Sequence, residues 1–147
     1  MRVSPLNSSY CKWTLVASGF YWGVRTRDLS PWLPSWADTR YALVCDVADA
    51  DSVRTAFTAL AQRHPTLDVL INNAAIYQPF FVKDATDEQI EAAVATNFIG
   101  PIYCSRAVIR MMQMGSHIIN ISSETVILPH AMFSLYQGSK VRSREVY

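Results

Sequence analysis

Hydrophobic positions recur with helical spacing through the middle of the chain. Val53, Phe57 and Leu60 stand at i, i+4 and i+7, so they share one face of a helix. The side chain of Asp49 or Asp51 can cap the first turn, and a His-Pro dipeptide just after the stripe stops the pattern. We therefore predict an amphipathic helix that buries these three apolar side chains.

A second helix is predicted further along by its first turn and by its apolar positions. Thr86 and Gln89 form a capping box, in which the threonine side chain bonds forward and the glutamine side chain bonds back. Pro101 kinks or restarts this helix, because proline has no N–H and its ring collides with the preceding turn. The residues expected on the buried side are Ile90, Ala93 and Val94, with Asn97 on about the same face, and Ile102, Val108, Met111 and Met112 beyond the proline.

Short apolar runs between these helices predict buried strands. They comprise residues 41–45 (YALVC), 68–71 (DVLI) and 117–122 (HIINIS). The second run leads directly into amide and small residues, and the third ends in a pair of serines. Small residues at the carboxyl end of a strand leave space for a ligand beside the backbone, which is where open α/β sheets bind their ligands.

Composition restricts the classes of function. The chain has 147 residues, 50% hydrophobic and 17% charged, which suits one soluble globular domain. A net charge of +1 provides no basic surface for nucleic acid. The three cysteines and three histidines are scattered, without the spacing of a disulfide framework or a metal site. No apolar run reaches the ~18 residues that span a membrane, and the start lacks a signal peptide. We therefore expect a cytoplasmic protein that binds no metal, membrane or nucleic acid.

Tyr136 and Lys140 provide the first chemical signal. They are four residues apart, so in a helix the phenol and the ammonium lie on one face, about one turn apart. A neighbouring cation favours the phenolate and lowers the pKa of a tyrosine from its usual ~10. Such a tyrosine can take a proton from an alcohol or give one to a forming alkoxide. Ser123, at the end of a strand, can hydrogen-bond the same substrate oxygen once the chain folds back.

In this order Ser123, Tyr136 and Lys140 resemble the active site of the short-chain dehydrogenases/reductases. Further motifs agree with the resemblance, each behind the strand or helix that the family requires. They are Asp46-Val47, the stretch Asn72-Asn73-Ala74-Ala75, which is similar to the family's N-N-A-G signature with alanine in the last place, and Asn97 in an N-x-x-G context. The resemblance covers roughly residues 40–140, about two thirds of the chain.

The resemblance implies both a fold and a chemistry. The fold is α/β, a Rossmann-like doubly wound parallel sheet, here incomplete. The chemistry is hydride transfer between NAD or NADP and a small carbonyl or alcohol substrate. The implied catalytic residues are Tyr136 as general acid or base, Ser123 to polarise the substrate oxygen, Lys140 to lower the tyrosine's pKa and bind the nicotinamide ribose, and Asn97 to hold a proton-relay water. The implied cofactor-binding residues are Asp46, Val47, Asn73, Ala74, Tyr136 and Lys140.

Each of these motifs also has a simpler structural explanation, which the residues leave open. Asp46 can cap a turn, and asparagines at a strand end, such as Asn73, often form a turn. Asn97 can bond a nearby carbonyl inside its helix. The Tyr-x-x-x-Lys spacing occurs by chance in many helices, so the joint order of the motifs carries the argument.

The first part of the chain departs from the family. Residues 12–16 (KWTLV) can form a first strand, and Gly19 and Gly23 then resemble a damaged T-G-x-x-x-G-x-G loop, whose glycines let the backbone approach a pyrophosphate. The three aromatic residues between them would crowd a dinucleotide, and an arginine stands where the last glycine belongs. Ordinary turn glycines are the alternative interpretation. We expect a degenerate or replaced segment, residues 1–39, before a partial Rossmann-like domain, residues 40–147.

The chain ends seven residues after Lys140, before the parts that complete family members and select their substrates. Two other hypotheses therefore stay open. The chain can be a catalytically inactive, truncated family member that acts as a fragment or interaction protein. It can also be a nucleotide-sugar epimerase, which shares Tyr-x-x-x-Lys, although the N-N-A-A stretch argues against this. Because the family often dimerises through the helix of the tyrosine, a homo-oligomer is expected if the fold is completed.

Overall fold

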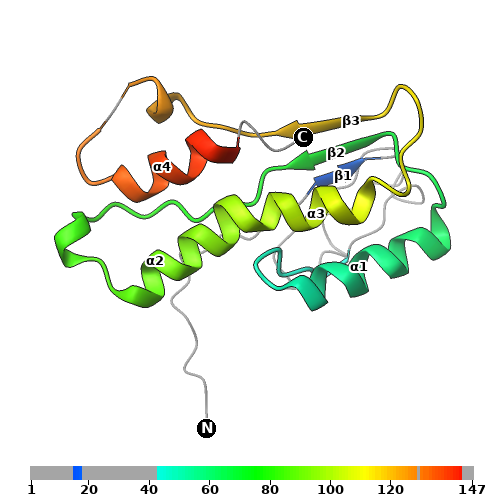
Figure 1. The fold of residues 1–147 in the computed structure, drawn as a ribbon, viewed down its shortest axis with the longest axis horizontal. Helices are drawn as coiled ribbons and strands as arrows, with labels where there is room; N and C mark the ends of the chain where they lie inside the picture. Colours follow the sequence, from blue (N-terminus) through cyan, green and yellow to red (C-terminus); the bar gives the residue numbers. More distant parts are fainter. Residues whose placement is uncertain (1–14, 18–42, 129, 144–147) are drawn as a thin grey trace, which may run out of the picture.

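The computed structural model describes residues 15–17, 43–128 and 130–143 (Figure 1). Helices and strands alternate along most of these ranges. The strands are β1 (Leu15–Ala17), β2 (Val69–Asn72) and β3 (His117–Asn120). The helices are α1 (Ala50–Arg63), α2 (Asp87–Val94), α3 (Gly100–Val108) and α4 (Ser134–Ser143). A π-helical segment, Ala95–Ile99, joins α2 to α3, and short 3-10 turns lie at Val82–Asp84 and Glu124–Val126.

β2 is the central strand of the described sheet, with β1 and β3 on its two sides. β3 runs parallel to it in the register Val69↔His117 to Asn72↔Asn120, which confirms the two predicted strands and the parallel pairing between them. β1 covers the end of the predicted first strand but pairs antiparallel with β2, so this edge of the sheet departs from the expected parallel arrangement. Residues 12–14 of that prediction lie outside the described residues.

The predicted strand at residues 41–45 is not present in the described part of this run. Residues 43–45 have no strand pairing, whereas residues 41 and 42 lie outside the described residues. The physical reason is that β1 and β3 already occupy both sides of β2, so no ladder position remains next to it. Leu43 and Cys45 still pack against the core, while Val44 between them is 77% exposed. The apolar run at residues 43–45 therefore packs partly against the core but forms no strand hydrogen bonds.

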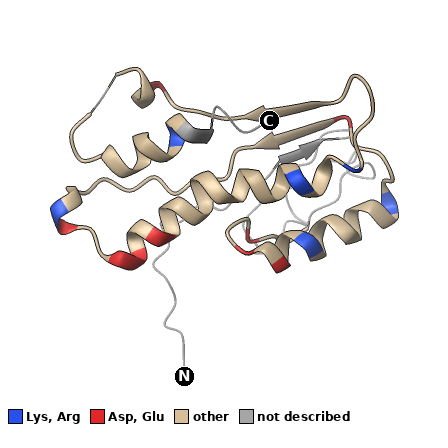
Figure 2. Ribbon diagram, viewed as in Figure 1, with Lys and Arg blue, Asp and Glu red and all other residues tan. Residues whose placement is uncertain are grey.

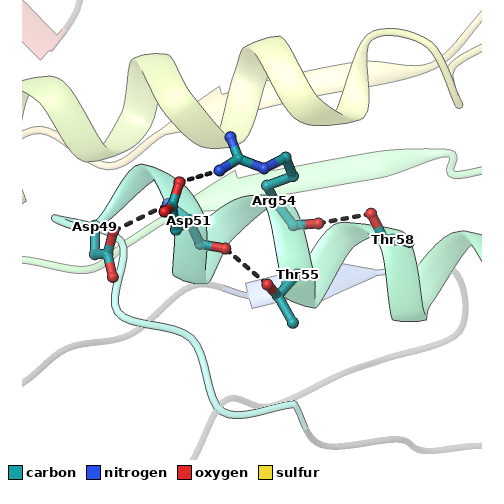
Figure 3. A network of polar contacts seen from close by, with 5 residues as sticks. All are labelled: Asp49, Asp51, Arg54, Thr55 and Thr58. Carbon is teal, nitrogen blue, oxygen red and sulfur yellow. Dashed lines mark hydrogen bonds and ion pairs between the residues drawn. The ribbon is translucent and has the colours of Figure 1, made fainter.

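Helix α1 forms as its sequence predicts. Asp49 is the N-cap, and its side chain accepts a hydrogen bond from the N–H of Asp51, with 2.9 Å between Oδ1 and N (Figure 3). Asp51 in turn pairs with Arg54, and the hydroxyl of Thr55 donates to the Asp51 carbonyl over 2.8 Å. These contacts occupy the solvent side of the first turns. The opposite face buries Val53, Phe57 and Leu60 as predicted, together with Ala56.

The main hydrophobic core lies where α1 and α3 pack on each other and on β2 (Figure 1). We call this region the apolar core. Its buried members are Val47, Val53, Phe57, Leu60, Leu67, Leu70, Ala74, Cys104, Val108 and Met111. Figure 1 shows that α2, the π-helical segment and α3 form one long rod, with α1 beside its α3 end and α4 beside its α2 end. Among the described residues, none of the helices has the length and apolar character needed to cross a membrane.

The start of α2 carries the predicted capping box. The Gln89 N–H donates to Thr86 Oγ1 over 3.3 Å, and the Thr86 N–H donates to Gln89 Oε1 over 3.0 Å. Burial along the helix is narrower than predicted, because Ala93 is buried but Ile90 and Val94 are 36% and 37% exposed. The difference follows from the packing, since among the described elements α2 lies against α4, beyond the strands of the sheet (Figure 1).

Candidate functional site

The carboxyl ends of β2 and β3 define one edge of the sheet, because parallel strands finish on the same side. Sequence analysis placed most of its candidates at this edge or on the helices beside it. β2 ends at Asn72 and leads into Asn73 and Ala74, whereas β3 ends at Asn120 and leads into Ser123. Helix α4 packs against the turn that follows Ser123 and against the π-helical segment.

Asn72 holds this edge together, a role that sequence analysis missed. Its Nδ2 donates to Asn120 Oδ1 over 2.8 Å and to Ser105 Oγ over 3.3 Å, and its carbonyl accepts from the Ile121 N–H over 2.9 Å. The side chain is buried and joins β2 to β3 and α3. The available signal was the strand period of two, which puts Asn72 on the same inward face as Leu70.

Asn73 is exposed at the strand end, and Ala74 is buried behind it.

Asp46, predicted to contact the cofactor, makes a turn, because its Oδ1 accepts from the Ala48 N–H over 3.0 Å. The same turn places Val47 against the helical rod. A methyl group added at Gly100 would lie 2.9 Å from Val47 Cγ2, which gives the glycine of the N-x-x-G context a packing reason.

Asn97 is fully buried in the π-helical segment and bonds two parts of the chain. Its Oδ1 accepts from the Ile76 N–H over 2.7 Å, and its Nδ2 donates to the Ile76 carbonyl over 3.0 Å. Nδ2 also donates to Ser139 Oγ over 3.0 Å. Ser139 Oγ then donates to the Tyr136 carbonyl over 2.7 Å. We call Ile76, Asn97, Ser139 and Tyr136 the polar junction.

The π-helical segment coincides with the proline that sequence analysis expected to disturb the helix. Pro101 stands in the first turn of α3 and cannot donate to the Asn97 carbonyl four residues earlier. The Gly100 N–H instead reaches the Ala95 carbonyl, five residues back. Such π turns inside α-helices are frequent at functional sites. The disturbance therefore surrounds the candidate asparagine itself.

Tyr136 and Lys140 lie on one face of α4, as their spacing predicts. The Lys140 Nζ is 6.0 Å from the centroid of the Tyr136 ring and donates to the Ile121 carbonyl over 2.8 Å. Only 3% of this lysine is exposed, and the burial lowers the pKa of its ammonium group. On its other side the Tyr136 ring meets Tyr77 edge to face, with 4.9 Å between ring centroids, and Tyr77 stacks on Phe133 at 4.7 Å.

Ser123 caps the 3-10 turn Glu124–Val126 that precedes α4. Its Oγ accepts from the Thr125 N–H over 3.3 Å and from the Thr125 hydroxyl over 2.9 Å. The neighbouring Ser122 donates to the Lys140 carbonyl over 3.4 Å, which links this turn to α4. Asn97 and Tyr136 are thus linked through Ser139, Lys140 lies beside Tyr136 on α4, and Ser123 begins a turn that packs against α4. The predicted glycines Gly19 and Gly23 lie outside the described residues.

A small pocket borders the polar junction, and a larger hollow lies elsewhere in the described part of the chain. A hollow of about 830 Å³ lies beside α1 and α3, lined mainly by apolar residues of both helices together with Arg54, Arg106 and Arg110. Figure 2 shows basic residues on these two helices and acidic residues gathered at the start of α2. The pocket beside Tyr136 measures only about 10 Å³, which is barely enough for one water. Among the described residues, no group of three or more His, Cys, Asp or Glu could hold a metal ion.

Known proteins resemble most of the chain. A family model described as short chain dehydrogenase matches residues 33–144. Galactitol 2-dehydrogenase of Agrobacterium fabrum is 30% identical over 102 residues, which make up 67% of this chain and 40% of that protein. An uncharacterized oxidoreductase of Methylorubrum extorquens is 29% identical over 99 residues, with the same two shares.

A comparison with solved structures also finds short chain dehydrogenases. A short chain dehydrogenase from Burkholderia cenocepacia in complex with NADP is 33% identical, with a TM-score of 0.66 over 70% of this chain and 42% of that one. This agreement identifies the described elements as part of a Rossmann-like α/β fold. The chain spans about 40% of the length of the curated relatives named above.

Proposed function

Because the chain belongs to the short-chain dehydrogenase family, we propose that it is an NAD(P)-dependent oxidoreductase that acts on a carbonyl or alcohol carbon. The observation that carries the proposal is the position of the Lys140 ammonium group. It is buried, is held 2.8 Å from the Ile121 carbonyl, and lies beside the Tyr136 ring. Burying a cation costs free energy. A cation retained beside a phenol therefore points to a chemical use.

Tyr136 is the proton-transferring group in this proposal. A phenol can give a proton to a forming alkoxide and take one back from an alcohol, and the Lys140 ammonium group lies 6.0 Å from the centroid of this ring. Tyr77 packs edge to face against the same ring and limits its movement. A general acid or base must stay within hydrogen-bond reach of the reacting oxygen, and this packing supports that requirement.

Ser123 and Asn97 complete the proposed set. Ser123 donates a hydrogen bond from its hydroxyl group to the substrate oxygen and stabilises the negative charge that develops there. Asn97 uses its side chain within the polar junction, so its part in a proton relay falls to its backbone carbonyl. Pro101 leaves that carbonyl without an α-helical donor, and a water bonded there is the proposed link to Lys140.

In this proposal Lys140 serves the nicotinamide ribose of the cofactor, whereas Asn73 and Ala74 lie beside the adenosine ribose. Lys140 offers an ammonium donor for the ribose hydroxyls, whereas Asn73 is exposed at the strand end with the small Ala74 beside it. When bound, the nicotinamide supplies or accepts the hydride. The relative from Burkholderia cenocepacia was crystallised with NADP, and this supports the proposed cofactor class. A small carbonyl or alcohol is the proposed substrate, in line with the name of the galactitol relative.

Binding of NADH and NADPH to the purified chain tests the proposal. We expect saturable binding by calorimetry, weakened about tenfold or more in Lys140→Ala, with Tyr136→Phe measured alongside. Lys83→Ala is the matched control, because Lys83 is exposed and contacts the neighbouring Asp84 and the Phe81 ring, away from the candidate residues. Circular dichroism checks that each variant is folded. A folded chain that binds neither nucleotide, or binds equally well without Lys140, would contradict the proposal.

A further inference from the structure

We propose that Thr125 is a positioning residue that makes Ser123 a pure hydrogen-bond donor toward the substrate. The inference rests on the proposed function and adds a residue to it. Two bonds carry it, both ending on one atom. Ser123 Oγ accepts from the Thr125 hydroxyl over 2.9 Å and from the Thr125 N–H over 3.3 Å.

The capacity of a serine hydroxyl decides what these two bonds do. Such a group has two acceptor lone pairs and one O–H donor. Thr125 occupies both lone pairs of Ser123 Oγ, so only the O–H remains for another partner. A substrate oxygen that meets Ser123 must therefore accept, as a carbonyl or alkoxide oxygen does. The hydroxyl proton of an alcohol finds no acceptor on Ser123 and is directed to Tyr136.

Burial makes this arrangement hard to replace by water. Thr125 is 8% exposed and lies inside the 3-10 turn that Ser123 caps. Its branched side chain has few rotamers, so the hydroxyl stays aimed at the serine. In addition, a hydroxyl that already accepts two hydrogen bonds is polarised and becomes a better donor. Thr125 thus separates the two roles at the substrate oxygen, with donation from Ser123 and proton exchange by Tyr136.

A double-mutant cycle tests this role apart from a structural one. Thr125→Val keeps the side-chain shape and the backbone N–H but removes the hydroxyl, whereas Thr125→Ser keeps the hydroxyl. Each is measured alone and with Ser123→Ala, by kcat/KM for the reduction of a panel of ketones with NADPH, with cyclohexanone as reference. We expect Thr125→Val to lose about tenfold, the size of one hydrogen bond. Thr125→Ser should stay within about twofold of the parent chain.

The decisive result is the loss of this effect when Ser123 is already alanine. Equal losses in both backgrounds, or full activity of Thr125→Val, would overturn the inference. A chain that binds nucleotide but reduces no ketone would count against the proposed function instead. In that case the same cycle, measured as unfolding in urea, still tests the contact: we expect the two sites to be coupled by about threefold in the unfolding constant, and additive effects would overturn the inference.

Discussion

The two ends of the helical rod hold the molecule together by different means. At the α3 end, the apolar core packs Phe57, Leu60 and Val108 from two helices onto β2. At the α2 end, the polar junction joins the rod to α4 through Asn97 and Ser139, both buried and both hydrogen-bonded. The first end is stabilised by buried area, the second by matched donors and acceptors.

This difference determines what each end tolerates. Burial of apolar area depends on the size and fit of a side chain, so similar side chains can replace one another at small cost. A buried donor or acceptor has no such substitute, because each group left without a partner costs about 1–3 kcal/mol. The candidate catalytic residues lie at or beside the polar junction, which tolerates fewer substitutions than the apolar core. The same bonds that stabilise the polar junction also fix Tyr136 and Lys140 in place.

The largest effect is expected from Asn97→Leu, which replaces the amide with an apolar group of similar volume. It leaves the Ile76 N–H, the Ile76 carbonyl and Ser139 without their partner, so we expect a loss of about 4 kcal/mol in unfolding free energy. Urea unfolding measures it. The control is Asn73→Ala, on an exposed asparagine, with an expected change within about 0.5 kcal/mol. Similar values for the two variants would show that the polar junction contributes little.

A somewhat smaller loss is expected in the apolar core from Leu60→Ala. Leu60 is 4% exposed, and its truncation opens a cavity that costs about 3 kcal/mol. Leu60→Met should cost less than about 1.5 kcal/mol, because it keeps the volume. The same urea experiment compares them. If both variants lost the same amount, the proposed tolerance of this end would be wrong.

Gly100→Ala tests the close packing of the helical rod against Val47. The added methyl group would lie 2.9 Å from Val47 Cγ2, so we expect a loss of about 2 kcal/mol. Gly138→Ala is the matched control, since nothing lies within 4 Å of its added methyl group inside α4. That change should stabilise the chain by about 0.5–1 kcal/mol. Effects of the same sign would contradict the packing at Gly100.

The smallest expected effect is a dependence of the unfolding free energy on pH. Burial lowers the pKa of Lys140 below its ordinary value near 10.5, so between the two values the unfolded chain binds the proton that the folded chain has lost. Unfolding free energy therefore rises with pH through this window, until the unfolded lysine also loses its proton. Comparison with Lys140→Met between about pH 7 and pH 10 isolates the contribution. A difference between the two chains that is flat, or that falls with pH, would show that the lysine is not buried as described.

Sequence was sufficient where a local rule decides the outcome. The stripe of Val53, Phe57 and Leu60, the capping box at Thr86, and the strand followed by Asn72 and Asn73 all follow from spacing within a few residues. The shared face of Tyr136 and Lys140 follows in the same way. The order of these motifs also identified the family, since each lies behind the element that the family requires.

The remaining features depend on which segments meet in space, and spacing does not contain that information. Ile90 and Val94 have the periodicity of buried residues but are partly exposed, on a helix that among the described elements packs against α4 rather than the sheet. Residues 43–45 have the composition of a strand, but both sides of the central strand β2 are occupied by β1 and β3. Thr125 and Ser139 are ordinary polar residues in the sequence, and only the fold shows that they bond Ser123 and Asn97.

The π-helical segment has a consequence for the evolution and engineering of this chain. An α-helix turns about 100° per residue, so one extra residue in a turn rotates everything that follows it. The five residues from Ala95 to Ile99 therefore rotate the side chains of α3 about the helix axis relative to those of α2. As a result, α2 faces α4 and α3 faces α1. Deleting one residue there would give a more regular helix in which only one end could keep its partners. The irregular turn is what lets a single rod serve two different neighbours.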